Sequence, residues 1–410
     1  MTDTPETPTP GALPLTTLRP VAPAAATRPL VTPISPSVVY CTADADAMDA
    51  VYEGSLPPGE AGYTYSREGH PNATALAGRI DAMEGLDPAA GGGTVTGSGM
   101  AAVAAVLLGL LEAGDHVVAS DQLYGRTARM MTRELPRLGI ETTLVDATDG
   151  DAVAAAMRPQ TRLIVVEVVA NPTIRIADMN RIAALAAAHP RALLVVDNTF
   201  TTPLGFPAFA RGADVVLHSV TKLLAGHSDA MLGWVAARDP VLNTALREAA
   251  ETWGLTPSPF DCWLAERGLT SFALRHERAT ANAAALAERL AGARGVVRVL
   301  YPGRADHPDH NRAQAVLQGR WGNMVSFVLE GGRAEVNAFL QAARAIPFAP
   351  TLGDVSTTLS HPASSSHRAL SEEARLALGI PEGFIRMSVG IDDAAAVGEV
   401  LAAAAESIAA

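Results

Sequence analysis

The sequence predicts an α/β protein, in which a mostly parallel, doubly wound sheet is followed by a smaller α+β domain. Continuous runs of Val, Leu and Ile occupy 162–169, 192–196 and 215–217, and an alanine-rich helical stretch at 181–188 separates the first two. Strands that helices cover on both faces have this continuous apolar pattern. After about residue 257 the pattern changes to long helical segments with widely spaced strand-like runs, which indicates the second domain.

The individual elements follow from the same patterns in chain order. Residues 1–30 are rich in Pro, Thr and Ala and have no periodic apolar pattern, so we expect a mobile tail. A glycine-rich turn at 91–93 leads into a short strand and then into the Gly97-Ser98-Gly99 turn, which opens an apolar helix. The expected helices cover 73–86, 100–111, 181–188 and 274–290, and the expected strands cover 94–96, 116–119, 141–145, 162–169, 192–196, 215–217, 324–329 and 384–389.

Composition and charge exclude several classes of protein. The chain has 410 residues, a formal net charge of −12 and no basic run, so neither nucleic acid nor an anionic membrane is an expected partner. The most apolar stretch, 100–111, is too short to span a bilayer. The two cysteines, Cys41 and Cys262, are far apart, which excludes a disulfide framework and fits a reducing compartment. We therefore expect a soluble, cytoplasmic protein.

One count within the basic residues points to chemistry. Of the 31 basic residues, only Lys222 is a lysine. Chance is one explanation, because an exposed cation tolerates exchange of lysine for arginine. The other explanation is that a lysine amine can form an imine, whereas an arginine cannot be deprotonated in a protein. The single lysine is therefore the first candidate for covalent catalysis.

Polar residues follow the three apolar runs at the point where each strand should end. Ligands of an open parallel sheet bind at this edge, and the 97–100 turn opens a helix whose N–H groups can bind an anion. These ends offer an amine, a carboxylate, hydroxyl groups and a phosphate site, which is the set that pyridoxal 5'-phosphate requires. The residues are Glu167 and Asn171, then Asp197, and finally Ser219, Thr221 and Lys222.

Each of these features has a purely structural alternative. The glycine turn can permit a tight connection, Asp197 can cap a helix, and Ser219 and Thr221 can be ordinary loop hydroxyls. Their combination beside the only lysine favours the cofactor. The glycine-rich 91–99 segment does not have the spacing of a dinucleotide-binding turn.

Two pairs of histidines could suggest a metal site. Neither pair has a third ligand nearby or the glutamate of a metalloprotease helix, and both lie in segments that the resemblance described next accounts for. We therefore expect no metal. The pairs are His307 with His310 and His361 with His367.

A longer series of motifs surrounds the single lysine. In their order along the chain they resemble the Cys/Met-metabolism enzymes that use pyridoxal phosphate, the transsulfuration family of cystathionine γ-synthase, cystathionine lyases, methionine γ-lyase and homoserine sulfhydrylases. The resemblance covers about residues 35–400. The motifs are Tyr65-Ser66-Arg67, Ser98-Gly99-Met100-Ala101-Ala102, Tyr124-Gly125, Asp197-Asn198-Thr199-Phe200, Gly212-Ala213-Asp214, His218-Ser219-Val220-Thr221-Lys222, Gly226-His227-Ser228-Asp229, Tyr301-Pro302-Gly303, Leu352-Gly353, His361-Pro362-Ala363 and Arg386-Met387-Ser388-Val389-Gly390.

The resemblance implies a role for each matching residue. Lys222 forms the imine with the cofactor and then moves protons, Asp197 pairs with the pyridinium nitrogen, and Tyr124 stacks on the ring near the reacting atoms. Arg386 binds the substrate carboxylate, for which a bidentate guanidinium is suited. The phosphate is held by Ser98, Gly99, Met100, Ser219 and Thr221, and Asn171 reaches the ring hydroxyl and, with Thr351, the substrate.

The resemblance also implies an assembly. The fold is then the aminotransferase-like fold type I of pyridoxal-phosphate enzymes, with a cofactor-binding domain at 61–257 and a C-terminal domain at 258–410. An N-terminal arm at 31–60 contacts a neighbouring subunit, and Tyr65 and Arg67 contact the phosphate in that subunit's site. The expected assembly is a homotetramer built from two dimers with shared active sites.

Three positions bear on which reaction of the family is catalysed. Cystathionine-handling γ-enzymes usually have Glu-Ser where this chain has Pro350-Thr351, and the following residues look more like methionine γ-lyase and the sulfhydrylases. Methionine γ-lyases commonly have Cys directly after the Tyr-Gly of the stacking loop, where this chain has Arg126. Arg126 can bind the distal end of the substrate or point to solvent or a subunit interface.

We expect γ-elimination on a sulfur amino acid, cystathionine or methionine, which releases a thiol, ammonia and 2-oxobutanoate. The alternative is γ-replacement on O-acetyl- or O-succinylhomoserine. A non-catalytic pyridoxal-phosphate binder is a third class, but it would not need Arg386.

Overall fold

The computed structural model describes residues 29–56 and 62–409, so the tail expected at 1–30 falls almost entirely outside the described residues. A seven-stranded sheet has the order β1-β7-β6-β5-β4-β2-β3. Its strands are parallel except β7, which is antiparallel to both β1 and β6. The strands are β1 Thr94–Thr96, β2 His116–Ser120, β3 Glu141–Val145, β4 Thr161–Glu167, β5 Leu193–Asp197, β6 Val215–His218 and β7 Gly233–Ala237.

Side chains of the central strands alternate between two apolar cores. In β4, Ile164 and Val166 pack into one core, whereas Leu163 and Val165 pack into the other. This alternation explains why the strands have no polar face in the sequence, since each face of a parallel sheet is covered by helices. The helices α2 (Pro71–Glu84), α6 (Met179–Ala188) and α9 (Pro259–Leu269) contribute to the first core, and α3 (Gly99–Leu110) and α8 (Pro240–Thr252) contribute to the second.

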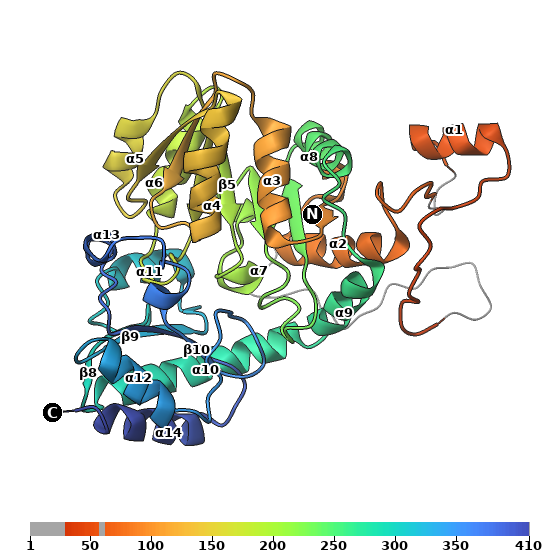
Figure 1. Cartoon of the computed structure of the whole chain (residues 1–410). Helices are drawn as coiled ribbons and strands as arrows, with labels where there is room; N and C mark the ends of the chain where they lie inside the picture. Colours follow the sequence, from red (N-terminus) through yellow and green to blue (C-terminus); the bar gives the residue numbers. More distant parts are fainter. Residues whose placement is uncertain (1–28, 57–61, 410) are drawn as a thin grey trace, which may run out of the picture.

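A second sheet of four antiparallel strands follows, in the order β10-β11-β9-β8. Figure 1 shows it below the central sheet, with α10, α12 and α14 beside it. Its own core includes Phe327, Phe339 and Leu401. The bounds are β8 Val296–Leu300, β9 Met324–Leu329, β10 Thr358–Ser360, β11 Phe384–Ser388, α10 Phe272–Ala291, α12 Arg333–Ala342 and α14 Ala394–Glu406.

The expected fold class is confirmed, with corrections at the level of single strands. The sequence patterns missed β7, β8 and β10. Strand β7 is an antiparallel strand inside a parallel sheet and is too rich in Gly and Ala to stand out. In β8, two central residues, Val297 and Arg298, are exposed, so the strand has no continuous apolar run.

Helix α10 joins the two regions of the chain. Cys262, Leu269 and Phe272 belong to the core of the large sheet, whereas Ala283 and Leu286 of α10 belong to the core of the second sheet. The large-sheet core thus continues past residue 257. The remaining helices are α4 Gly125–Arg129, α5 Gly150–Ala156, α7 Thr202–Gly205, α11 His310–Leu317 and α13 Glu372–Ala377.

The part of the N-terminal segment that carries helix α1 stands away from the rest of the chain (Figure 1), whereas Thr32 and Ser35 hydrogen-bond to Glu266 and Asn72. Its helix α1, Ala45–Glu53, buries none of its residues. Tyr52 and Val39 are 65% and 61% exposed, which leaves apolar surface open along the segment. Within residues 29–56 and 62–409, no helix is both long and apolar enough to cross a bilayer.

Candidate active site

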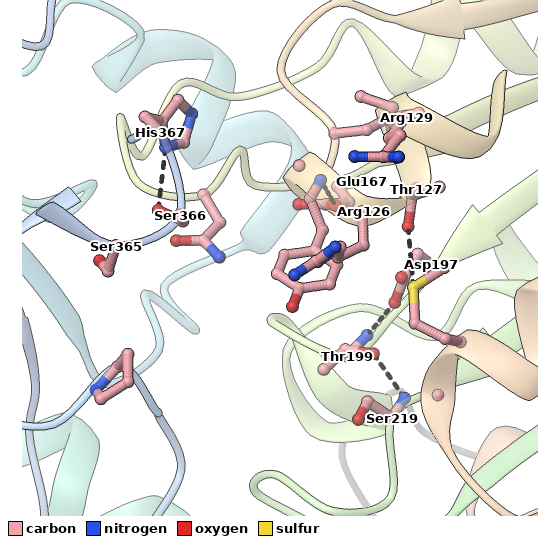
Figure 2. Close-up of a pocket in the computed structure, with 18 of the residues that line it drawn as sticks. Arg126, Thr127, Arg129, Glu167, Asp197, Thr199, Ser219, Ser365, Ser366 and His367 are labelled. Atoms are coloured by element: carbon pink, nitrogen blue, oxygen red, sulfur yellow. Dashed lines mark hydrogen bonds between the residues drawn. The ribbon is translucent and has the colours of Figure 1, made fainter. Parts of the chain in front are cut away.

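A cavity of about 1320 Å³ lies where the carboxyl ends of the large sheet's strands face the C-terminal domain. Figure 2 shows Asp197, Thr199 and Ser219 on one side of it and Ser365, Ser366 and His367 on the other. Of the residues predicted for the site, the cavity is lined by Ser98, Gly99, Met100, Tyr124, Arg126, Asn171, Asp197, Ser219, Thr221, Lys222, Thr351 and Arg386.

Two carboxylates form the inner wall. Glu167 and Asp197 are the last residues of β4 and β5 and are partners in the strand register. Burial raises the pKa of Asp197, but hydrogen bonds from Thr199 and the positive charge of His218 oppose that rise. Burial and the charge of Asp197 raise the pKa of Glu167 well above its ordinary value. Two adjacent carboxylates repel each other when both are ionised, so one of them tends to keep its proton. The pKa of Glu167 is the more strongly raised, so this arrangement favours a proton on Glu167 and a charge on Asp197.

Lys222 lies in the turn that follows β6. Its Nζ donates a hydrogen bond to Thr351 Oγ1 at 3.4 Å, so the amine is held against the C-terminal domain. Burial and the positive charge of Arg386 lower the pKa of this amine. A lower pKa increases the neutral fraction of the amine, which is the form that attacks a carbonyl or accepts a proton.

The start of helix α3 closes on the turn after β6. Ser98 caps the helix, since its hydroxyl accepts a hydrogen bond from the Ala101 N–H at 3.1 Å. A Cβ at Gly99 would lie 2.6 Å from the Cβ of Ser219, so only glycine permits this approach. A helix N-terminus beside a serine suits a phosphate group. The Thr221 hydroxyl, in contrast, bonds to the backbone of Leu232, at 2.9 Å from its N and 3.1 Å from its O.

Arg386, on β11, supplies a buried guanidinium from the second domain. Its Nη1 donates to Asn171 Oδ1 at 2.9 Å and its Nη2 donates to the carbonyl of Thr351 at 2.5 Å. Burial lowers the pKa of Arg386 to about 10, which leaves it charged at neutral pH. Within the part of the chain that the structure describes, its Nε is buried and has no hydrogen-bond partner.

The loop that carries Tyr124 and Arg126 forms the outer wall. The Tyr124 N–H donates to Glu167 Oε1 at 2.6 Å, which ties this loop to the end of β4. A Cβ at Gly125 would lie 2.9 Å from the carbonyl oxygen of Ser366, so the loop also packs closely against the C-terminal domain. Arg126 is exposed, and Figure 2 shows its side chain among the residues that line the cavity.

Tyr65 and Arg67 do not line this cavity within the single chain. The Arg67 guanidinium lies 5.5 Å from the Tyr65 ring centroid, and its Nη1 lies 3.4 Å from the carbonyl of Glu251. Arg67 lines a separate cavity of about 300 Å³ beside α2 and α8. Their predicted role in a neighbouring subunit's site stays a prediction.

Some residues of the site were not singled out from the sequence. Glu167 was noted only as a polar strand end, and its hydrogen bond to the Tyr124 loop joins residues 43 positions apart. His367 was considered only as a possible metal ligand with His361, and not as a residue of this cavity. Burial and the charge of Arg386 lower the pKa of His367 to about 4, so its imidazole is neutral at pH 7.

The four histidines considered for a metal have other partners. His307 Nδ1 accepts from the Asp309 N–H at 3.1 Å, and His361 Nε2 lies 2.7 Å from the Glu382 carbonyl. His310 Nδ1 lies 3.2 Å from the Pro302 carbonyl. Among the described residues there is no group of three or more His, Cys, Asp or Glu side chains that could hold a metal ion.

The residues fit pyridoxal phosphate. The close approach at Gly99 forms a cradle that any side chain would fill, and Asp197 is a half-buried carboxylate without an ion-pair partner among the described residues. Lys222 supplies an amine of lowered pKa between them. The unpartnered Nε of Arg386 marks where an anionic group of the substrate can bind.

Comparisons with known proteins agree with this site. The family model for Cys/Met metabolism PLP-dependent enzymes matches residues 21–406. The cystathionine gamma-lyase of Bacillus subtilis is 40% identical and covers 85% of this chain and 89% of its own length. The L-methionine gamma-lyase of Fusobacterium nucleatum subsp. polymorphum is 38% identical, over 82% of this chain and 84% of its own.

A solved structure shows the same fold. The cystathionine gamma synthase of Xanthomonas oryzae pv. oryzae, in complex with cystathionine, superposes with a TM-score of 0.84 at 36% identity and covers 92% of this chain and 93% of its own. Sequence motifs, fold and cavity therefore lead to one conclusion: the chain belongs to the Cys/Met-metabolism family of enzymes, whose cofactor is pyridoxal phosphate.

Proposed function

We propose that the enzyme catalyses γ-elimination on a sulfur amino acid, with cystathionine favoured over methionine, and releases a thiol, ammonia and 2-oxobutanoate. The observation that carries the choice of substrate is the outer part of the cavity. Arg126, Arg129, Arg133 and Arg368 line it, and none of them has an ion-pair partner among the described residues. Unpaired guanidinium groups favour a substrate with a distal carboxylate, which cystathionine has and methionine lacks.

The chain's own residues can perform the required steps. Arg386 binds the substrate's α-carboxylate, and Asn171, already bonded to Nη1, orients the guanidinium. The bound cofactor supplies an electron-withdrawing ring that stabilises negative charge at the substrate's α- and β-carbons. The Lys222 amine, with its lowered pKa, accepts a proton from the α-carbon and moves protons at the β-carbon. The Tyr124 phenol, on the outer wall of the cavity, donates a proton to the leaving thiolate.

Residues of the inner wall hold the ring. Asp197 pairs with the pyridine nitrogen, and Ser219 with the start of α3 binds the phosphate. Thr351 Oγ1 accepts a hydrogen bond from the free Lys222 amine at 3.4 Å, which keeps the lysine side chain beside this wall.

The alternative is γ-replacement on O-succinylhomoserine, whose distal carboxylate fits the same arginines. The two reactions share the inner wall and differ in what attacks after the leaving group departs. The likeness to the Xanthomonas synthase favours this alternative, and the likeness to the Bacillus lyase favours elimination.

One assay separates the two. Purified enzyme is incubated with cystathionine, methionine, O-acetylhomoserine or O-succinylhomoserine, each with and without a thiol. Both 2-oxobutanoate, the product of elimination, and the thioether amino acid, the product of replacement, are followed. We expect 2-oxobutanoate from cystathionine without added thiol, and a smaller rate from methionine. Turnover only of an acylhomoserine in the presence of a thiol contradicts elimination. The Lys222→Ala variant serves as the inactive control, and its rate is the background of the assay.

We also propose that the active enzyme is a tetramer of two dimers. One support is the exposed apolar surface of the N-terminal segment, at Val39 and at Tyr52 on the projecting helix α1. The other is the position of Tyr65 and Arg67 outside this chain's cavity. Sedimentation of the full chain and of a chain that lacks residues 1–56 tests it: the shortened chain should dissociate.

A further inference from the structure

A buried acid and imidazole lie at the same edge of the large sheet as the inner wall. Glu84, the last residue of α2, and His218, the last residue of β6, approach to 2.5 Å between Oε1 and Nε2. Both side chains are 0% exposed, and neither lines the cavity. They therefore have no contact with substrate, and the cost of burying them requires another explanation.

Neighbouring side chains hold Glu84 and His218 in place. The Asn198 Nδ2 donates to Glu84 Oε1 at 2.8 Å and to the Phe206 carbonyl at 2.9 Å. The His218 ring lies against the Trp234 ring, with centroids 5.7 Å apart. In the part of the chain that the structure describes, Glu84 Oε2 and His218 Nδ1 are buried without hydrogen-bond partners.

Asp81, also on α2, accepts a hydrogen bond from Trp234 Nε1 at 2.9 Å, so this carboxylate already has a partner. Asp197 lies on β5, the strand next to the one that carries His218. The Asn198 N–H donates to the Leu217 carbonyl at 2.9 Å, which places Asp197 and His218 on adjacent strands at the same edge of the sheet.

The environment of Asp197 shows the effect of the imidazole. Burial favours the neutral acid, and the neighbouring Glu167 adds a second carboxyl at the same register. The Thr199 N–H, at 3.0 Å from Asp197 Oδ1, favours the charged form. The positive charge of His218 acts in the same direction as Thr199 and opposes the rise in the pKa of Asp197 that burial causes. Lys222 and Arg386 line the cavity that Asp197 faces.

We propose that Glu84 keeps a proton on His218, so that the resulting imidazolium holds Asp197 ionised for the pyridine nitrogen of the cofactor. Glu84 and His218 are then positioning residues that act through Asp197. The inference rests on the role proposed above for Asp197.

The test compares two ligands of the apoenzyme. One is pyridoxal phosphate, and the other is its carbocyclic analogue, which has a ring C–H in place of the nitrogen. Both have the aldehyde and the phosphate, so only the contact with Asp197 distinguishes them. Their dissociation constants are measured by absorbance and fluorescence titration for wild type and for Glu84→Gln, which keeps the shape of the side chain and an amide oxygen as acceptor.

We expect wild type to prefer pyridoxal phosphate and Glu84→Gln to lose at least about tenfold of that preference, since one pKa unit at Asp197 is a tenfold change in its ionisation. His218→Asn should lose it equally. Glu266→Gln, which removes another buried carboxylate, 3.2 Å from Arg79, should keep it. Equal weakening of both ligands by Glu84→Gln means a structural role only and overturns the proposal. Absence of any preference in wild type refutes instead the role of Asp197.

A measurement on wild type covers the case in which the variants do not fold. Nitrogen-15 chemical shifts of the histidines in the apoenzyme report the protonation of each ring. We expect His218 to show two protonated nitrogens at pH 7.5. A neutral imidazole at that pH overturns the proposal.

Discussion

The inner wall and the outer rim of the cavity are built in opposite ways. On the inner wall, Glu167 is buried and Asp197 is half-buried, both accept hydrogen bonds, and each affects the charge of its neighbour. On the outer rim, Arg126 and Arg129 are exposed and have no ion-pair partner among the described residues. A rigid set of buried charges suits one cofactor and one kind of proton transfer, whereas free cations suit a choice among substrates. Family and cofactor thus follow from the wall, whereas the proposed choice of substrate depends on the rim.

The largest effect should come from the wall. Lys222→Ala should lower kcat by at least about 10³-fold for every substrate, because the amine that moves the protons is lost. In wild type, borohydride reduction should attach the cofactor to one peptide, which contains Lys222, with the N-terminal amine as the only competing site. Peptide mass mapping and initial rates check both points. Wild-type activity in the variant would contradict the mechanism.

The next effect concerns the carboxylate site. Arg386→Lys should lower kcat/KM about 100-fold for all amino-acid substrates, because a lysine cannot replace the bonds to Asn171 and Thr351 and bind a carboxylate in two places. The matched control is Arg298→Lys, on the same sheet but outside the cavity, which should leave the rates unchanged. A loss confined to one substrate would move Arg386 to the specificity-determining part of the site.

The rim is tested by Arg126→Gly. A charge-assisted hydrogen bond is worth about 1.5–3 kcal/mol, which corresponds to roughly a tenfold to hundredfold loss of kcat/KM. We expect this loss for cystathionine and O-succinylhomoserine and little change for methionine. Arg344→Gly, in a turn outside the cavity, controls for the loss of an exposed arginine. A uniform loss would indicate a structural or interface role, and no loss would place Arg126 in solvent.

The smallest effect should be a pH dependence on the rim. Burial and the charge of Asp146 raise the pKa of Asp121 to about 6. Above pH 6 Asp121 is ionised and repels a distal carboxylate; below pH 6 it is neutral. KM for cystathionine should therefore fall as the pH decreases through 6, by up to about fivefold, which corresponds to the roughly 1 kcal/mol of a charge pair close to solvent. In Asp121→Asn, this change in KM should disappear, whereas KM for methionine should be independent of pH in both proteins.

Much of the inner wall could be predicted from the sequence because its residues follow strands that local apolar patterns reveal. Continuous apolar runs located β4, β5 and β6, and the polar residues that end them had to meet at one edge of a parallel sheet. The assignments of Lys222 and Asp197 follow from that rule and from the family resemblance. They stay predictions until the ligand titrations are done.

What could not be predicted depends on contacts between distant residues. Glu84 reads as an ordinary helix residue, and only the fold brings it to His218, 134 positions away. The same holds for the contact of Gly125 with Ser366. Strand β8 was missed because the exposure of its central residues is set by the sheet edge and not by the local sequence.

The alternation of β4 and β5 between two cores has a consequence for how this sequence can change. A shift of one residue in either strand would move every side chain in it to the opposite face of the sheet. Glu167 and Asp197 are the last paired residues of these two strands, so the same shift would displace them too. A single-residue insertion or deletion there would therefore remove folding and chemistry together, with no intermediate in which one survives. The loops beyond the rim are free of this constraint, so variation in length should concentrate there while the two strands keep their length.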